Sequence, residues 1–297
     1  MLALMGTTLV GCGSAGGASN TSAQNSSGSN TSNSSSNSST NTSTTTADSS
    51  YQNAVKNGVT LGIYPGAPYT YIDQKTQKPT GIDWDIMTTA LKDAGITKYK
   101  YDIMPWASLV PALLSKRIDI LTGDIHKTPA RDKIIAFTGP AWWYGPAIIV
   151  QKGNPGHIST YSDLTKSNIT VGAVNGSAAQ EYLNTIHAHV ITYQGGTSEF
   201  TSLEQGRETA VLEDKPKFAA FLKANTNSNL EALNITPPTN LITTYGYGYA
   251  RYALRKSDVS LNQKISAALA QMRSDGEMLK ILEKWGLNKN NLTWLFR

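Results

Sequence analysis

The chain has 297 residues, of which 39% are hydrophobic, and its formal net charge is +5. This length is enough to bury a core, and it allows one large domain or two smaller ones. The Lys and Arg residues are scattered and form no dense basic stripe that would neutralise phosphates, which argues against a nucleic-acid-binding protein.

The N-terminus is apolar from Met1 to Val10 and leads into Cys12, the one cysteine of the sequence. Without a second thiol, Cys12 is either an unmodified small residue or a chemically modified one. The segment from Leu9 to Gly13 resembles a bacterial lipoprotein signal, in which the cysteine is diacylated and becomes the new N-terminus. The usual positive charge is missing, since the first basic residue is Lys56. We expect residues 1–12 to be signal-like and Cys12 to be the lipidation site.

Residues 13–50 consist almost wholly of Ser, Asn, Thr, Gly and Ala. Such a stretch has too little apolar surface to offset the entropy cost of ordering, so we predict a disordered tether or, alternatively, a tail without a role. No later segment approaches the roughly 18 consecutive apolar residues of a membrane span. The sequence therefore predicts that any membrane attachment is by lipid alone.

From Tyr51 onward, short apolar runs alternate with helical patterns. Strands and helices that alternate in this way predict parallel pairing through right-handed crossovers, and hence an α/β layer. Thr128-Pro129 has the sequence of an N-cap followed by proline at the first helical position. The expected elements are strands at Val59–Tyr64, Tyr99–Ile103 and Ile118–Thr122, a helix with Ile86, Met87, Ala90, Leu91 and Ala94 on one face that ends at Gly95, and a helix over about Ser108–Lys116.

A second α/β series begins near Ala147. Two successive α/β units in one chain suggest two lobes with a cleft between them. The expected elements are strands at Ile148–Gln151, Ile169–Val174 and Ala210–Leu212, a helix that opens at Asn175-Gly176-Ser177, and C-terminal helical faces with Leu261, Ile265, Leu269 and Met272, then Leu279 and Leu282.

The folded region also carries seven short motifs in one order. They are Gly81-Ile82-Asp83-Trp84-Asp85-Ile86, Trp106-Ala107-Ser108-Leu109-Val110-Pro111-Ala112-Leu113, Asp119 to Arg131, Phe137-Thr138-Gly139-Pro140, Val171-Gly172 through Asn175-Gly176-Ser177, Ala210-Val211-Leu212-Glu213-Asp214, and Glu283-Lys284-Trp285-Gly286. In this order and spacing they resemble family 3 of the bacterial extracellular solute-binding proteins, the polar amino-acid receptors of ABC importers. The resemblance runs from about Leu61 to Trp285.

The resemblance implies an α/β fold of the type II periplasmic-binding-protein kind, with two lobes, two hinge strands and an inter-lobe ligand cleft. The hinge strands are expected near Tyr144–Ala147 and Tyr245–Ala250. Lobe 1 would comprise residues 51–144 and 250–297, and lobe 2 residues 145–249. Ligand would contact both lobes only when they shut, so its binding would drive closure.

An amino acid is a zwitterion, so a dry cleft needs a donor fork for its carboxylate and an anion for its ammonium. Arg131 matches the family's arginine in a Thr-Pro-x-Arg helix start, and its planar guanidinium can bond both carboxylate oxygens. Asp214 matches the family's ammonium-binding aspartate at the end of a lobe 2 strand. The alternatives are a surface arginine in a first helical turn and an aspartate that only caps a loop.

Further residues are expected to line the cleft. Ser177 lies at a predicted helix N-terminus, where free N–H groups bind anions, or it is only the helix cap. Trp106 takes the place of the family's pocket aromatic, which packs a side-chain stem or stacks on a cation, or it belongs to the core. Tyr69 and Tyr71 are expected to line the wall of the cleft.

Departures from the family pattern concern the ligand. Tyr64 stands where an aspartate usually follows the first strand, and Ala67 stands at the place of a stacking aromatic. The Gly and Thr that help to hold the carboxylate are Asp124 and His126 here. A carboxylate at position 124 competes for Arg131, whereas His126 can donate to the ligand or pair with Asp124.

Glu213, Asp214 and Asp124 place up to three acids near the cleft. If all face inward, they favour a ligand with extra positive charge, such as arginine, lysine or ornithine. Alternatively, Glu213 points outward and Asp124 only pairs with His126. We predict the monomeric substrate-binding component of an ABC importer, anchored by lipid at the cell surface or in the periplasm. It would capture a polar or cationic amino acid and pass it to a permease and ATPase complex.

An enzyme is the main alternative, because cyclohexadienyl dehydratases resemble these receptors. An acid such as Glu213 would protonate a leaving hydroxyl if burial raised its pKa. The sequence contains no hydrolase, zincin or P-loop motif and no Cys/His metal spacing, so we predict no catalysis, no cofactor and no metal. His187 and His189 are expected at an exposed helix end rather than in a metal pair.

Overall fold

The computed structural model describes residues 48–293. The predicted signal-like segment, Cys12 and nearly all of the predicted tether lie outside that range. Within it, the helices are too short or too polar to cross a membrane.

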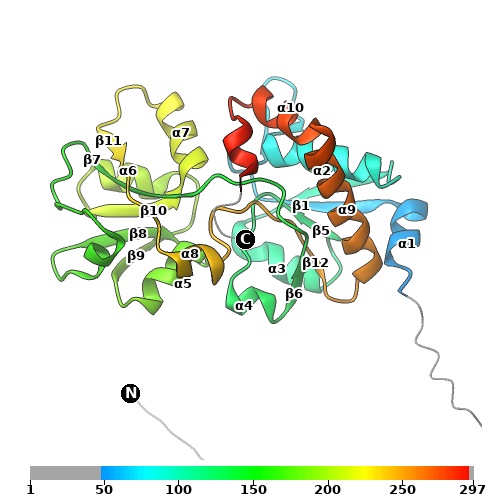
Figure 1. The fold of residues 1–297 in the computed structure, drawn as a ribbon, viewed down its shortest axis with the longest axis horizontal. Helices are drawn as coiled ribbons and strands as arrows, with labels where there is room; N and C mark the ends of the chain where they lie inside the picture. The colour runs from blue at the N-terminus through cyan, green and yellow to red at the C-terminus, as the bar shows by residue number, and fades with distance from the viewer. Residues whose placement is uncertain (1–47, 294–297) are drawn as a thin grey trace, which may run out of the picture. The chain divides into compact units, whose positions relative to one another are not determined.

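Five strands form the sheet of lobe 1, in the order β4-β1-β5-β12-β6 (Figure 1). Strand β1 pairs in parallel with β4 and β5, as the alternation of strands and helices predicts. Strand β12 comes from much later in the chain and pairs antiparallel with β5 and β6. The bounds are β1 Val59–Ile63, β4 Tyr99–Ile103, β5 Ile120–Thr122, β6 Ile135–Phe137 and β12 Ala253–Arg255.

Helices cover both faces of this sheet. Successive strand residues point to opposite faces, so apolar residues on each face pack against a separate set of helices. Ile120 and Leu254 face one core with α1, α2, α9 and α10, whereas their neighbours Leu121 and Ala253 face a second core with α3. The bounds are α1 Ser50–Asn57, α2 Ile82–Asp93, α3 Trp106–Leu114, α4 Pro129–Asp132, α9 Val259–Asp275, α10 Glu277–Lys284, the 3₁₀ turn η2 Lys289–Leu292, and the hairpin strands β2 Tyr71–Ile72 and β3 Pro79–Thr80.

Lobe 2 has its own five-stranded sheet, in the order β11-β7-β10-β8-β9. Strands β10, β8 and β9 run parallel, and β7 joins β10 and β11 antiparallel. The strands are β7 Pro146–Gln151, β8 Thr170–Val174, β9 His189–Tyr193, β10 Ala210–Asp214 and β11 Leu230–Ala232. The helices are η1 Tyr161–Thr165, α5 Ala178–Thr185, α6 Ser198–Glu204, α7 Lys215–Ala224 and α8 Thr239–Thr243.

Two antiparallel segments connect the lobes where the hinge strands were predicted. Trp143 forms a β-bridge with Tyr249. The Tyr144 N–H donates to the Gly248 carbonyl at 2.9 Å. Gly248 has φ +86°, and a Cβ there would lie 2.6 Å from the Trp143 ring, so no larger residue fits this crossing. The residue bounds of the two lobes remain a prediction.

Two local expectations need adjustment. The Thr128 hydroxyl accepts from the Arg131 N–H at 3.4 Å, which confirms the N-cap, but α4 has only four residues because β6 begins at Ile135. In α10, the buried residues are Met278, Ile281 and Leu282, so Leu279 was wrongly assigned to the buried face of that helix.

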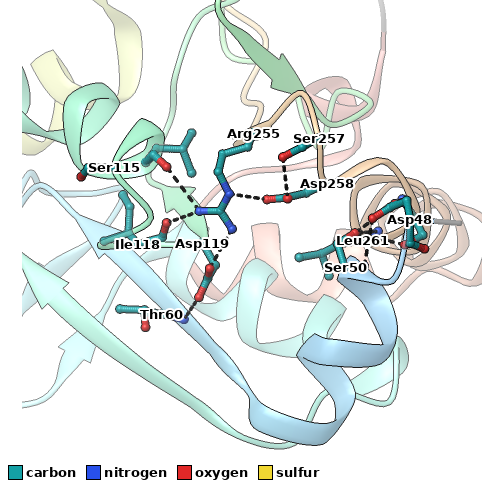
Figure 2. A network of polar contacts seen from close by, with 12 residues as sticks. Asp48, Ser50, Thr60, Ser115, Ile118, Asp119, Arg255, Ser257, Asp258 and Leu261 are labelled. Atoms are coloured by element: carbon teal, nitrogen blue, oxygen red, sulfur yellow. Dashed lines mark hydrogen bonds and ion pairs between the residues drawn. The ribbon is translucent and has the colours of Figure 1, made fainter. Parts of the chain in front are cut away.

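A polar network ties the sheet of lobe 1 to the start of α9 (Figure 2). The Arg255 guanidinium forms ion pairs of 2.8 Å with both Asp119 and Asp258, and it donates to the Ile118 carbonyl at 2.6 Å. Asp119 also accepts from the Thr60 N–H at 2.9 Å. We call Asp119, Arg255 and Asp258 the Arg255 network.

Candidate ligand-binding cleft

A cavity of about 370 Å³ lies where strands of the two lobes end. It follows the carboxyl ends of the parallel strands β1, β5, β8 and β10, which is where ligands bind in α/β sheets. Lobe 1 contributes Tyr64, Ala67, Tyr69, Trp106, Asp124 and His126, lobe 2 contributes Ser177, Glu213, Asp214, Lys217 and Phe221, and Tyr247 adds a wall near the second crossing.

Direct hydrogen bonds link the two sides of the cavity. The Tyr69 hydroxyl donates to Asp214 at 3.0 Å. The Gly196 N–H donates to the Tyr64 hydroxyl at 2.7 Å, and the Arg131 guanidinium donates to the Gly176 carbonyl at 2.7 Å. Because these pairs join residues of different lobes, the structure shows the lobes in contact around the cavity.

Asp124 and Asp214 come from different lobes and meet at the cavity wall, where both are buried. Each carboxylate has one oxygen held by a tyrosine, Tyr144 for Asp124 and Tyr69 for Asp214. The other oxygen of each, Oδ1, is buried and accepts no hydrogen bond from residues 48–293. Neither acid forms an ion pair with a Lys or Arg of that range. Two acidic groups are thus held together with no Lys or Arg of residues 48–293 in ion-pair contact.

His126 lies beside both acids. Its Nε2 is 3.7 Å from Oδ1 of Asp214 and 2.8 Å from the Tyr144 hydroxyl, and its ring stacks on Tyr247 with centroids 4.3 Å apart. Ligand atoms of Asp124, His126 and Asp214 all lie within 4.8 Å of one another. We call these three residues the cleft cluster. The expected direct pairing of Asp124 with His126 is replaced by contacts that both make with Tyr144.

Burial controls the ionisation of the cleft cluster. It raises the pKa of Asp124, and the nearby charge of Asp214 raises that pKa further. It also raises the pKa of Asp214, with Glu213 adding to the effect. Burial and then the positive charge of Arg131 lower the pKa of His126 to about 3. At neutral pH His126 is therefore uncharged and does not compensate the two acids.

The backbone holds Asp124 in a conformation that non-glycine residues rarely adopt, with φ +22°. Its N–H donates at 2.9 Å to Asp83, a fully buried residue in the first turn of α2. Asp83 also accepts from Trp142 and Tyr252, each at 3.0 Å. These bonds fix the position of the Asp124 side chain.

Arg131 lies next to the cavity but outside its lining residues. Two of its five N–H groups donate to backbone carbonyls, at 3.0 Å to His126 and at 2.7 Å to Gly176. Its guanidinium carbon is 5.3 Å from the centre of the Trp106 ring. In this structure Arg131 joins the two lobes beside the N-terminus of α5, and it keeps N–H groups for a further acceptor.

The predicted aromatic wall is present in part. Trp106 and Tyr64 both line the cavity and contact each other edge to face, with centroids 5.9 Å apart. Tyr71 instead packs edge to face on Trp285 and is not among the lining residues. The expectation that Tyr71 lines the wall of the cleft is therefore wrong.

Glu213 points to the cavity and is paired there. Lys217 lies 2.6 Å from Glu213 and 2.7 Å from the buried Glu199. Because Lys217 compensates Glu213, Asp124 and Asp214 are the cavity-lining acids of the described residues that lack an ion pair with Lys or Arg. Ser177 lines the cavity and also caps α5, since its hydroxyl accepts from the Gln180 N–H at 3.1 Å.

The contributors that escaped the sequence analysis include Tyr144, Tyr247 and Lys217. Lys217 follows Glu213 by four residues at a predicted strand end, and this spacing could have indicated an ion pair. Tyr144 and Tyr247 belong to the two crossings, where the pattern gives no information about which side chains face the cleft.

Comparison with known proteins agrees with this architecture. The family model of bacterial extracellular solute-binding proteins, family 3, matches residues 59–288. The ABC transporter arginine-binding protein 1 of Escherichia coli K12 is 27% identical over 211 residues, which are 69% of this chain and 81% of that protein. The L-cystine-binding protein TcyJ of the same strain is 29% identical over 233 residues, 75% of this chain and 79% of that protein.

Solved structures show the same arrangement. An ancestral arginine-binding protein bound to arginine superposes with a TM-score of 0.65 at 28% identity, covering 76% of this chain and 97% of that one. An ancestral amino acid-binding protein, a precursor of cyclohexadienyl dehydratase, gives a TM-score of 0.66 at 25% identity over 79% and 98%.

Two α/β lobes around a cavity that contains acids from both lobes define a solute-binding protein of the type II periplasmic class. More narrowly, the chain belongs to family 3 of the bacterial extracellular solute-binding proteins.

Proposed function

We propose that the protein captures an amino acid, cationic or polar in its side chain, and delivers it to an ABC importer. The observation that carries this proposal is the pair of buried carboxyl groups, Asp124 and Asp214, that face each other across the cleft with no Lys or Arg of the described residues in ion-pair contact. A ligand that brings positive charge offsets their desolvation cost, and it contacts both lobes at once.

A bound amino acid can satisfy the site as follows. Its ammonium lies against Asp214 and Asp124, and its carboxylate lies between Arg131 and the N-terminus of α5, which the Arg131–Gly176 bond brings together. Its side chain then extends along Tyr64 and Trp106, which line the cavity. Relatives that are named for binding arginine and cystine support this ligand class, as do ancestral structures described as bound to arginine and to glutamine.

A receptor accounts for the site better than an enzyme does. Glu213, the candidate acid for a dehydratase, is committed to an ion pair of 2.6 Å with Lys217. An acid that is held by a cation in this way is a poor proton donor to a leaving hydroxyl. The family and the curated relatives are transport proteins. We infer that the chain does not catalyse a reaction, that Cys12 carries the lipid that anchors it, and that it works as a monomer.

The test is a thermal-shift and calorimetric screen of the full chain against the proteinogenic amino acids, ornithine and prephenate, with EDTA present. A ligand at one hundred times its Kd raises the free energy of unfolding by about 2.7 kcal/mol. We expect arginine, lysine or ornithine to give the largest shift. Stabilisation by no amino acid, or production of phenylpyruvate from prephenate, would overturn the proposal.

Variants assign the two ends of the ligand. Asp214→Asn and Arg131→Ala are each expected to weaken binding at least about a hundredfold, because each leaves a charged end of the ligand without its partner. Arg117→Ala is the matched control, since Arg117 is exposed and pairs only with Asp102 at 2.7 Å. Unchanged affinity in Arg131→Ala would refute the carboxylate assignment.

A further inference from the structure

The cleft cluster has a donor set that goes beyond the requirements of an ammonium group. It combines two carboxylates and one imidazole nitrogen, from residues that are each buried. The imidazole extends the set from hard oxygen donors to the mixed nitrogen and oxygen set that first-row transition metals prefer. We propose that Asp124, His126 and Asp214 bind a divalent transition-metal ion, such as Zn²⁺ or Mn²⁺, in place of the ligand ammonium.

The free oxygens of the two acids support this site. Oδ1 of Asp124 and Oδ1 of Asp214 are buried and accept no hydrogen bond from the described residues. The Asp214 oxygen is also the atom that lies 3.7 Å from Nε2 of His126. Ligands about 2.0–2.2 Å from one zinc ion are roughly 3.4 Å apart, so this pair of atoms needs only a small movement to share a metal.

The second oxygens of both acids are held in place by hydroxyl groups. Tyr144 donates to Oδ2 of Asp124, and Tyr69 donates to Oδ2 of Asp214 at 3.0 Å. Hydrogen bonds of this kind orient carboxylates whose other oxygen binds a metal. Because Tyr144 donates to Asp124, the 2.8 Å contact has the Nε2–H of His126 donating to the Tyr144 oxygen. A metal would bind Nε2 with the imidazole proton on Nδ1, and it would replace this contact.

The charge balance favours a divalent ion over an ammonium group. A divalent ion carries two positive charges, so it compensates both buried carboxylates once their protons are released, whereas one ammonium compensates only one of them. The three protein ligands leave at least one coordination position facing the cavity, as in zinc sites that bind a further ligand. Because metal and ammonium use the same acids, only one of them occupies the cluster at a time.

Metal binding is tested on the full chain after treatment with EDTA and removal of the chelator. The chain is titrated with Zn²⁺ and with Mn²⁺ by calorimetry, and bound metal is counted by mass spectrometry after gel filtration. We expect one ion per chain. His126→Gln is expected to weaken metal binding at least a hundredfold, and Tyr144→Phe by 10- to 100-fold, since the phenylalanine keeps the ring but loses the hydroxyl that orients Asp124.

The control is a chain with both His187→Gln and His189→Gln, which removes two exposed histidines outside the cleft and should leave the affinity unchanged. Melting curves in EDTA establish that each variant is folded. Metal retention that is equal in the wild-type and His126→Gln chains, or that is lost with the surface pair, would overturn the inference.

The amino-acid screen with EDTA separates this inference from the proposed function. If the chain binds an amino acid but no metal, only the metal-site inference is refuted. If it binds a metal but no amino acid, only the proposed function is refuted.

Discussion

Two groups of acids in this protein differ in whether a protein cation compensates them. In the Arg255 network, Asp119 and Asp258 share one guanidinium at 2.8 Å each, so two negative charges meet a positive one (Figure 2). In the cleft cluster, Asp124 and Asp214 contact tyrosine hydroxyls, a neutral imidazole and each other, with no Lys or Arg among residues 48–293 in ion-pair contact. The first group therefore joins β5, β12 and α9 within one lobe, whereas the second, shared by both lobes, is left for a cation from outside.

This difference implies opposite effects on stability. A network whose acids are compensated by a cation stabilises the fold. The loss of that cation leaves the acids without a partner of opposite charge. An uncompensated pair costs stability in the empty protein, and this cost is recovered when a ligand binds. Substitutions of comparable size in the two groups should therefore change the free energy of unfolding in opposite directions.

Arg255→Ala should have the largest effect on stability. It leaves Asp119 and Asp258 without their cation and the Ile118 carbonyl without its donor. We expect the free energy of unfolding to fall by about 3–5 kcal/mol, measured by urea denaturation in EDTA. Ligand affinity of the remaining folded protein should be unchanged, because the network lies away from the cavity lining. A loss below about 1 kcal/mol would contradict the role assigned to the network.

Asp124→Asn should have the opposite sign. It removes one of two adjacent buried carboxyl groups whose raised pKa values cost stability at neutral pH, it keeps the shape of the side chain, and asparagine tolerates the left-handed backbone at this position. We expect the empty protein to gain about 1–2 kcal/mol of stability, while affinity for a cationic ligand falls at least tenfold. Both are measured on the same preparation, by urea denaturation and by calorimetry.

The matched control is Asp119→Asn, an equal substitution in the Arg255 network. It is expected to destabilise the protein, because Arg255 then loses one of its two ion pairs. If both asparagine variants lost stability, the acids of the cleft would be structural, and the contrast between the two groups would fail.

The sequence was sufficient to predict most of the scaffold. Strand β4 runs over Tyr99–Ile103 as predicted, and Ser177 caps α5 as predicted, because periodicity and capping chemistry act within a few residues. The order of β12 within the first sheet was not predictable in this way, since its pairing with β5 joins residues far apart in the chain.

The site was predictable by residue type but not by pairing. Asp124, His126 and Asp214 were each identified as candidates, yet their meeting depends on how the lobes close. Lys217 shows the same limit, because its charge cancels that of Glu213 only through a contact of 2.6 Å. Ion pairs of this kind decide which acids remain available to a ligand. The number of acids in the sequence does not show which of them are paired.

Substitution of Asp48 should have the smallest effect on stability. This acid lies outside both groups and forms its hydrogen bonds at the start of α9. Its carboxylate accepts hydrogen bonds from the N–H and hydroxyl of Ser50 and from the Ser260 N–H. The hydrogen bond from the Ser260 backbone is the main cause that lowers the pKa of Asp48 to about 2. A negative charge at a helix N-terminus is favourable in itself.

Since the folded-state pKa is below the ordinary value, the stabilisation by Asp48 is complete above about pH 4 and is lost as the pH falls through about 2. Asp48→Asn should therefore lower the melting temperature slightly near neutral pH, by less than about 1 kcal/mol in stability because the group is largely solvated. The gap between wild type and variant should narrow below pH 4 in melting curves recorded across pH. A gap that stayed constant down to the lowest pH at which the chain folds would show that hydrogen bonding at this position, which asparagine partly keeps, matters more than its charge.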